Sequence, residues 1–155
     1  MCIRDRDRGE IAVGYEAFAL EMKGAAKCFE FMTYDYGEMQ ARPDFSIRIY
    51  KEHEVFPLFD ENLKLNEVFS VSDITYDVTF EHLKDAYEEA GIEMIDFKTQ
   101  ALALVDMGLL ELLEMLKEQG GEEIYTHELE RAKQLIMPSF LGERFKMIRF
   151  RQEAA

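Results

Sequence analysis

Apolar residues spaced by three and four predict two helices in the N-terminal part of the chain. The first runs from Glu10 to Met22, and Gly24 follows it as a C-terminal stop. The second begins after Thr79, a residue type that caps helices well, and Gly91 closes it. Its apolar face is predicted to consist of Phe80, Leu83, Ala86, Tyr87 and Ala90.

A longer helical pattern fills the C-terminal part of the chain. It predicts one helix from about Thr99 to Lys117, which Gly120-Gly121 breaks. A further helix is predicted over Thr126 to Met137, where Pro138 stops it. The residues that we expect the first of these helices to turn inward are Leu102, Val105, Leu109, Leu112 and Leu116.

Short apolar runs predict strands at residues 27–34, Ile92–Phe97 and Phe145–Phe150, and the alternating residues 46–50 predict another. A turn is expected at Tyr36-Gly37, after the first run. Ile92–Phe97 is apolar on both faces, which indicates an internal strand. Because strands alternate with helices, the predicted fold class is α/β.

The charge of the chain narrows the choice of partners. Its 155 residues suit one domain, and 18 basic against 32 acidic residues give a net charge of −14. Binding to nucleic acid depends on clustered Lys and Arg, so this composition argues against a nucleic-acid partner. The acidity favours a soluble surface, and the sharper alternative is a surface that attracts basic peptides.

The sequence contains no glycine-rich phosphate loop and no metal-binding motif. Its two cysteines make neither a disulfide framework nor a zinc site, and Cys28 is predicted to pack as a small hydrophobe inside the first strand. This cysteine usage indicates a reducing, cytoplasmic location. The histidines are scattered and are predicted to be surface or structural residues; they are His53, His82 and His127.

Residues 1–8 have neither a helical nor a strand period, since they alternate Arg and Asp. We interpret them as a non-native leader and exclude them from the fold, which leaves residues 9–155 as the folded part. The alternative is a short charged disordered tail.

Polar residues at the end of the first predicted strand are the first candidates for a site. Asp35-Tyr36-Gly37 follows the apolar run directly. Open α/β sheets bind ligands in the crevice outside the carboxyl ends of their strands, so this segment is well placed to face a ligand.

A second polar group precedes the helix that starts after Thr79. Asp77 is predicted to cap that helix, whereas Asp73 and Thr75 lie too far ahead of it for that role and could bond a loop or line a site. For Tyr50 we expect core packing, and for His53 a surface position.

Five stretches, taken in order, resemble the C-terminal half of the MidA-like S-adenosylmethionine-dependent methyltransferases. They are DYG at 35–37, IRIYKEH at 47–53, DITYDVTF at 73–80, KTQALALVDMGLLELL at 98–113 and LIMPSFLGERFKMI at 135–148. The likeness covers nearly everything after residue 9. Mitochondrial members of this family methylate an arginine of a respiratory complex I subunit.

The resemblance implies the last part of a class I methyltransferase sheet, with residues 27–34, 92–97 and 144–150 as its fifth, sixth and seventh strands, one of them antiparallel. The family binds S-adenosylmethionine on its first strands, through a glycine-rich loop and a ribose-binding acid. This sequence contains neither of them. We therefore expect the cofactor only in a full-length parent protein and predict that this chain alone is an inactive fragment.

The resemblance also suggests roles for the polar residues. A guanidinium stays protonated at neutral pH, so carboxylates that hold it would orient the attacking nitrogen. Asp35 and Asp73 are the catalytic candidates. The candidates for acceptor binding are Tyr36, Gly37, Tyr50, His53 and Thr75. The family often has a His where this sequence has Asp77, which leaves the role of that position open.

A different class of function remains open. The chain could be an acidic protein-binding or assembly module that docks a basic partner without chemistry. In either case the expected partner is a protein segment, basic or arginine-containing, and not a membrane. If the fourth strand of the sheet is absent, the bare edge of strand 27–34 predicts self-association.

Overall fold

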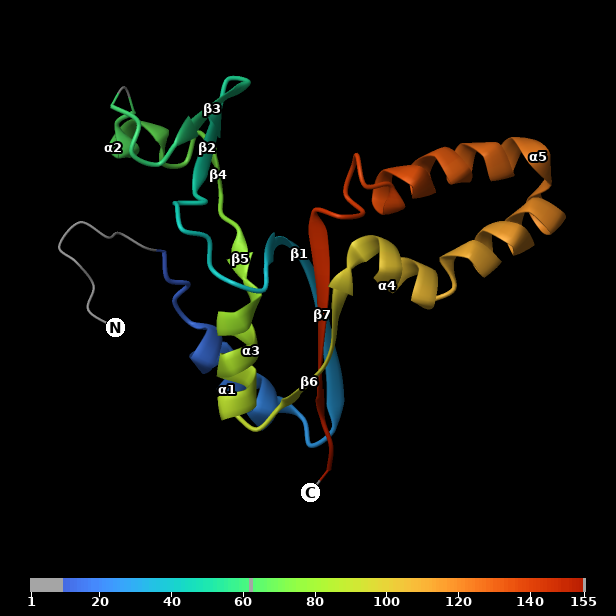
Figure 1. The fold of residues 1–155 in the computed structure, drawn as a ribbon, viewed down its shortest axis with the longest axis horizontal. Coiled ribbons are helices and arrows are strands. Elements are labelled where there is room, and N and C mark those ends of the chain that lie inside the picture. The colour runs from blue at the N-terminus through green and yellow to red at the C-terminus, as the bar shows by residue number, and fades with distance from the viewer. Residues whose placement is uncertain (1–9, 62, 155) are drawn as a thin grey trace.

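The computed structural model describes residues 10–61 and 63–154, and the predicted leader lies outside them. Its centre is a mixed four-stranded sheet in the order β5-β1-β7-β6 (Figure 1). The strands of this main sheet are β1 (Phe29–Glu38), β5 (Val78–Thr79), β6 (Glu93–Thr99) and β7 (Phe145–Gln152). Helices α1 (Tyr15–Ala25) and α3 (Phe80–Glu89) pack beside each other against it. The predicted α/β class is confirmed.

The antiparallel strand that the family resemblance implied is β7, the last one. β7 lies between β1 and β6 and is antiparallel to both, whereas β5 is parallel to β1. The β1–β5 ladder contains only Gly37 and Glu38 of β1. Within the described part of the chain, residues 29–36 therefore have no strand partner on that side.

β1 is longer than predicted, and the turn expected at Tyr36-Gly37 is wrong. Gly37 continues the strand with φ 150°, and a Cβ at this position would lie 2.1 Å from the backbone oxygen of Val78. Only glycine lets the two backbones approach this closely. At the other end, Cys28 precedes β1 and is exposed, so its predicted packing inside the strand is also wrong.

The core lies between the main sheet and the two helices. The ring of Tyr87 stacks on Phe150 with centroids 4.2 Å apart and on Phe31 at 5.6 Å. All five residues predicted for the apolar face of α3 are buried, and Thr79 precedes the helix as predicted, although its side chain makes no capping hydrogen bond. Burial of these aromatic groups supplies the main apolar stabilisation.

β6 is an edge strand, so the prediction that it is internal is wrong. A register shift between Met94 and Asp96 interrupts the alternation of its side chains. Met94 and Phe97 pack against the core, while Asp96 and Lys98 pair with each other at 2.8 Å. The irregularity, rather than burial on both faces, therefore explains why apolar residues fall at both odd and even positions of the strand.

α1 begins later than predicted, and Gly24 lies inside it. Gly14 precedes the helix in the left-handed conformation, with φ 104°. The residues before Gly14 are not helical because Glu10 bonds the backbone of a distant loop, as described below.

A smaller sheet projects from the main body (Figure 1). Its order is β3-β2-β4, and all its neighbours are antiparallel. The elements of this second sheet are β2 (Arg48–Lys51), β3 (Glu54–Pro57) and β4 (Asp73–Thr75), with the short helix α2 (Leu65–Val68) between β3 and β4. Ile49 is its fully buried residue, whereas Tyr50 is 43% exposed, so the predicted core packing of Tyr50 is wrong.

Helices α4 (Gln100–Asp106) and α5 (Leu109–Ile136) form an arm that extends from one end of the main sheet (Figure 1). Gln100 Nε2 anchors its base by donating to the backbone oxygen of Leu135 at 2.8 Å. The predicted break at Gly120-Gly121 is confirmed as a kink inside α5, where Gly121 has φ 79°. The last helix ends at Ile136, before Pro138, as expected.

The single helix predicted over residues 99–117 is wrong. Gly108, with φ 92°, separates α4 from α5, so one continuous apolar stripe cannot run through both. Leu113 is the buried residue of this stretch of α5. The exposed residues among those predicted to face inward are Leu102, Val105 and Leu112.

Candidate functional site

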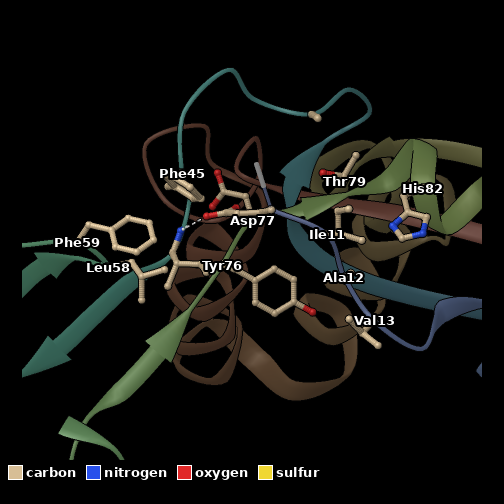
Figure 2. Close-up of a pocket in the computed structure, with 13 residues that line it drawn as sticks. Ile11, Ala12, Val13, Phe45, Leu58, Phe59, Tyr76, Asp77, Thr79 and His82 are labelled. Atoms are coloured by element: carbon tan, nitrogen blue, oxygen red, sulfur yellow. Dashed lines mark hydrogen bonds between the residues drawn. The ribbon is translucent and has the colours of Figure 1, made fainter. Parts of the chain in front are cut away.

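A cavity of about 1010 Å³ opens where the main sheet meets the second sheet. It lies beside β5, since Tyr76 and Asp77 precede this strand and Thr79 ends it. Its walls are mostly apolar or aromatic, and Figure 2 shows Tyr76 between two groups of them. The residues that line it are Glu10, Ile11, Ala12, Val13, Ala41, Phe45, Ile47, Leu58, Phe59, Tyr76, Asp77, Thr79 and His82.

Glu10 holds the loop before β2, which forms one wall of the cavity. Its Oε1 accepts the backbone N–H groups of Ser46 at 2.7 Å and Ile47 at 2.9 Å, and its Oε2 accepts the Ser46 hydroxyl at 2.6 Å. Ser46 is buried, so these bonds satisfy polar groups that water does not reach. Glu10 therefore acts as a clamp on the loop before β2.

Asp77 extends this network instead of capping α3, so its predicted role as a cap is wrong. Its backbone N–H donates to Ser46 Oγ at 2.8 Å, and its Oδ2 accepts from Arg42 Nη1 at 2.9 Å. The hydrogen bonds that Arg42 donates, chiefly to Asp77 and then to Asp44, raise its pKa. Both carboxylates that line the cavity, Glu10 and Asp77, are thus engaged within the protein.

Two tyrosines connect the cavity to Asp35. Burial raises the pKa of Tyr15 strongly, and a hydrogen bond with Tyr76 adds to the shift. The charge of Asp35 makes the smallest contribution to the raised pKa of Tyr15. Tyr76 lines the cavity, so the three side chains lead from the predicted strand-end acid to the cavity wall.

His82 lies at the α3 side of the cavity (Figure 2). Its Nε2 lies 3.0 Å from Glu16 Oε1, and its ring centroid is 5.1 Å from that of Tyr15. The hydrogen bond with His82 lowers the pKa of Glu16. His82 ties α1 to α3, as a structural histidine would.

The predicted site residues fall into two groups that the structure keeps in separate sheets. Asp35, Tyr36 and Gly37 lie in β1 of the main sheet, where the ring of Tyr36 contacts Phe145. Gly37 has a structural task in the contact with β5. None of the three lines the cavity.

The other predicted site residues lie in the second sheet or its turn. Tyr50 pairs with Asp73 across β2 and β4, and Thr75 pairs with Arg48. His53 lies in the turn after β2, exposed as predicted and with a positive φ of 70°. In the described ranges, Asp73 makes no hydrogen bond or ion pair with Asp35, and none of this group lines the cavity. Their roles toward an acceptor stay predictions.

Sequence reasoning missed Glu10, Tyr15 and Tyr76. Tyr76 belongs to the Asp-Ile-Thr-Tyr-Asp segment, so its presence among candidate polar residues was a usable signal. The sequence contains no signal for the roles of Glu10 and Tyr15, because their partners are more than thirty residues away along the chain.

Two further properties of the described residues bear on the site. Residues 10–61 and 63–154 contain no group of three or more His, Cys, Asp or Glu arranged to hold a metal ion. No helix in these ranges is both long and apolar enough to cross a membrane.

Known proteins resemble this chain in fold. No protein-family model and no curated protein matches it. The chain does match a crystal structure of an uncharacterized COG1565 superfamily protein from Burkholderia thailandensis, with a TM-score of 0.73 and 19% sequence identity. The match covers 90% of this chain and 37% of that protein. A second structure from that organism matches with a TM-score of 0.70, 19% identity, and coverage of 90% and 36%.

The second structure is that of a superfamily member described as a "likely methyl transferase" and bound to S-adenosyl-homocysteine. The chain therefore has the α/β fold of a methyltransferase-like COG1565 protein over nine tenths of its length. It spans just over a third of the length of these two structures.

The cavity does not fit a complete S-adenosyl cofactor. Nucleotide-type sites in such folds hold the ribose hydroxyls with a carboxylate. Among the described residues, the carboxylates that line the cavity are Glu10 and Asp77. Glu10 already accepts hydrogen bonds from the loop before β2, and Asp77 already accepts one from Arg42.

Proposed function

We propose that this chain forms the acceptor side of an S-adenosylmethionine-dependent methyltransferase, whose cofactor is held by strands outside the described residues. The observation that supports this proposal is the fold match to a structure bound to S-adenosyl-homocysteine. Because the match covers 36% of that structure, catalysis belongs to a protein that contains this chain together with the remaining strands. The 155-residue chain alone is proposed to be inactive.

The proposed acceptor is a protein arginine. The cavity presents the aromatic rings of Phe45, Phe59 and Tyr76, and a guanidinium is attracted to such ring faces. Among the residues that line it there is no Lys or Arg to repel a cation. The cavity would therefore accept the side chain, exclude water from it and limit its orientations.

Asp35 is proposed to act through the tyrosine pair. The charge of Asp35 acts on Tyr15, which is neutral at about pH 7 in any case and interacts with Tyr76 at the wall of the cavity. The Tyr76 hydroxyl would then be held in one orientation toward the acceptor. Asp73 has no comparable connection to the cavity, so we expect Asp35→Asn to lower turnover more than Asp73→Asn does.

The first test uses the chain as it is. Isothermal calorimetry with S-adenosyl-homocysteine is expected to show no binding, and measurable affinity would overturn the assignment of the cofactor to other strands. The second test replaces the matched part of the Burkholderia protein with residues 10–154 and measures transfer of labelled methyl groups to arginine-containing peptides.

The chimera is expected to bind S-adenosyl-homocysteine and to label arginine peptides, with the Lys-for-Arg peptides as matched controls. Asp35→Asn in the chimera should reduce labelling about 10-fold or more while cofactor binding is retained. A folded, cofactor-binding chimera that labels no peptide contradicts the proposed acceptor role.

A further inference from the structure

One stretch of the arm exposes large apolar side chains on consecutive turns. Exposed apolar residues are ordinary when they are scattered, but here four of them fall within nine residues around the start of α5. The exposed fractions are 49% for Met107, 48% for Leu110, 61% for Leu112 and 53% for Met115. Leu112 and Met115 are three residues apart and so lie on the same side of α5.

A row of carboxylates runs beside these two residues. Glu111, Glu114 and Glu118 follow a spacing of three and four, so they form a stripe next to Leu112 and Met115 on α5. We call these five residues the arm strip. Each of the three glutamates is exposed and makes no ion pair or hydrogen bond through its side chain within the described part of the chain.

Other acids of the arm differ in this respect. Asp106 binds Lys98 at 2.7 Å, Glu128 binds Arg131 at 3.1 Å, and Glu130 pairs with Lys133. Lys117 lies three residues after Glu114 but makes no ion pair with it, since its Nζ lies over the ring of Tyr125, 5.1 Å from the centroid. The glutamates of the arm strip therefore present unpaired carboxylates beside an apolar surface.

The charge of the arm identifies the kind of occupant. Residues 100–136 contain eight Asp and Glu against three Lys and Arg, a net charge of −5. A second copy of this chain would bring the same negative arm and would be repelled. A helix with Leu-type residues on one face and Lys or Arg beside them matches both the apolar row and the acidic row.

We propose that the arm strip is a docking site for a basic amphipathic helix of a protein partner. The partner's apolar face covers Leu112 and Met115, and its cations pair with Glu111, Glu114 and Glu118. This contact needs neither the cavity nor methyl transfer, so it stands apart from the proposed function.

The test uses a fluorescein-labelled peptide of Leu and Lys with helical amphipathic spacing, long enough at about 18 residues to form a helix on binding. Fluorescence anisotropy measures its affinity for the 155-residue chain at low salt. Leu112→Gln with Met115→Gln is expected to weaken binding about 10-fold or more, since both contacts are central to the strip. Glu111→Gln, Glu114→Gln and Glu118→Gln together should weaken binding and flatten its salt dependence.

Matched controls separate docking from general attraction to an acidic protein. Val55→Gln with Phe69→Gln changes two residues of similar exposure, 52% and 77%, away from the arm and should leave the affinity unchanged. A peptide with Glu in place of Lys should not bind. Circular dichroism and the melting temperature verify that each variant is folded.

Three results would overturn the proposal. The first is no binding of the Leu–Lys peptide, and the second is an equal loss of affinity in the control variant. The third is a dimer in analytical ultracentrifugation that Leu112→Gln with Met115→Gln dissociates, which would make a second copy the occupant.

Discussion

The two sheets of this molecule are stabilised in different ways. In the main sheet β1 and β7 pair over eight successive residues, and Phe31, Tyr87 and Phe150 stack beside them. In the second sheet the ladders contain three or four pairs, and side chains such as Val55 and Ile74 are about half exposed, at 52% and 47%. Apolar burial stabilises the first sheet, whereas the second has little of it.

The second sheet depends on hydrogen bonds made by residues outside its strands. Glu10 holds the loop that enters β2, and Ser46 links that loop to Asp77 at the end of the β4 segment. Regions with few buried apolar contacts open at a lower free energy than the core. Because the cavity lies where the two sheets meet, local opening of the second sheet would reshape its walls without unfolding the main sheet.

Phe150→Ala should produce the largest effect and should unfold both sheets together. Its ring is fully buried against Tyr87 and Phe31, and deletion of such a ring costs about 3–5 kcal/mol. Urea denaturation followed by circular dichroism measures the loss. Phe69→Ala, at a residue that is 77% exposed, is the control and should cost little. An equal cost in the two variants would contradict the assignment of the core.

Glu10→Gln should act on the second sheet alone. The amide oxygen of Gln can still accept the backbone N–H groups of Ser46 and Ile47, but the amide nitrogen cannot accept the buried Ser46 hydroxyl, at a cost of about 1–3 kcal/mol. Amide hydrogen exchange should accelerate in β2 and β4 while β1 and β7 stay protected.

Glu54→Gln provides the matched change at an exposed glutamate of β3 and should leave exchange unaltered. If Glu10→Gln instead accelerated exchange in the whole molecule, the two sheets would form one cooperative unit and the comparison between them would fail.

Tyr87→Phe should stabilise the main sheet by about 1 kcal/mol. The Tyr87 hydroxyl is buried and has no hydrogen-bond partner among the described residues, and burial raises its pKa to about 12. Removal of the hydroxyl ends this desolvation cost and keeps the ring stack. A thermal melt measures the gain, and Tyr50→Phe, at an exposed tyrosine, should show none. A loss of stability would indicate that the hydroxyl has a partner.

The sequence predicted the parts of the fold that local patterns determine. The apolar face of α3, the strand positions and the kink at Gly121 each follow from spacing or from a single glycine. Two of the failures share a cause, which is a contact between distant segments. Gly37 continues β1 because Val78 approaches it, and α1 starts late because Glu10 is held by the 46–47 loop.

The candidate site was less predictable for the same reason. Asp35 was identified from its position near the end of a strand, but its link to the cavity passes through Tyr15 and Tyr76, which are about sixty residues apart in the chain. Asp73 was grouped with Asp35 because both are acids in stretches that resemble the same family. Assigning them to separate sheets requires the strand pairing, which no local pattern contains.

The smallest expected effect concerns an exposed ion pair on the main sheet. Glu30 on β1 accepts from Arg151 on β7 at 2.9 and 2.6 Å, and this bond lowers the pKa of Glu30. A carboxyl group whose pKa is lowered by folding adds stability above its unfolded pKa, and that stability is lost as the pH falls through the folded pKa. Glu30→Gln should therefore lower the melting temperature slightly at about pH 7 and not in acid below the folded pKa, where the carboxyl is protonated in both states. Glu21→Gln, at an exposed glutamate of α1, should change it at neither pH. A difference for Glu30→Gln that persists in acid would show that the residue contributes by packing and not by its charge.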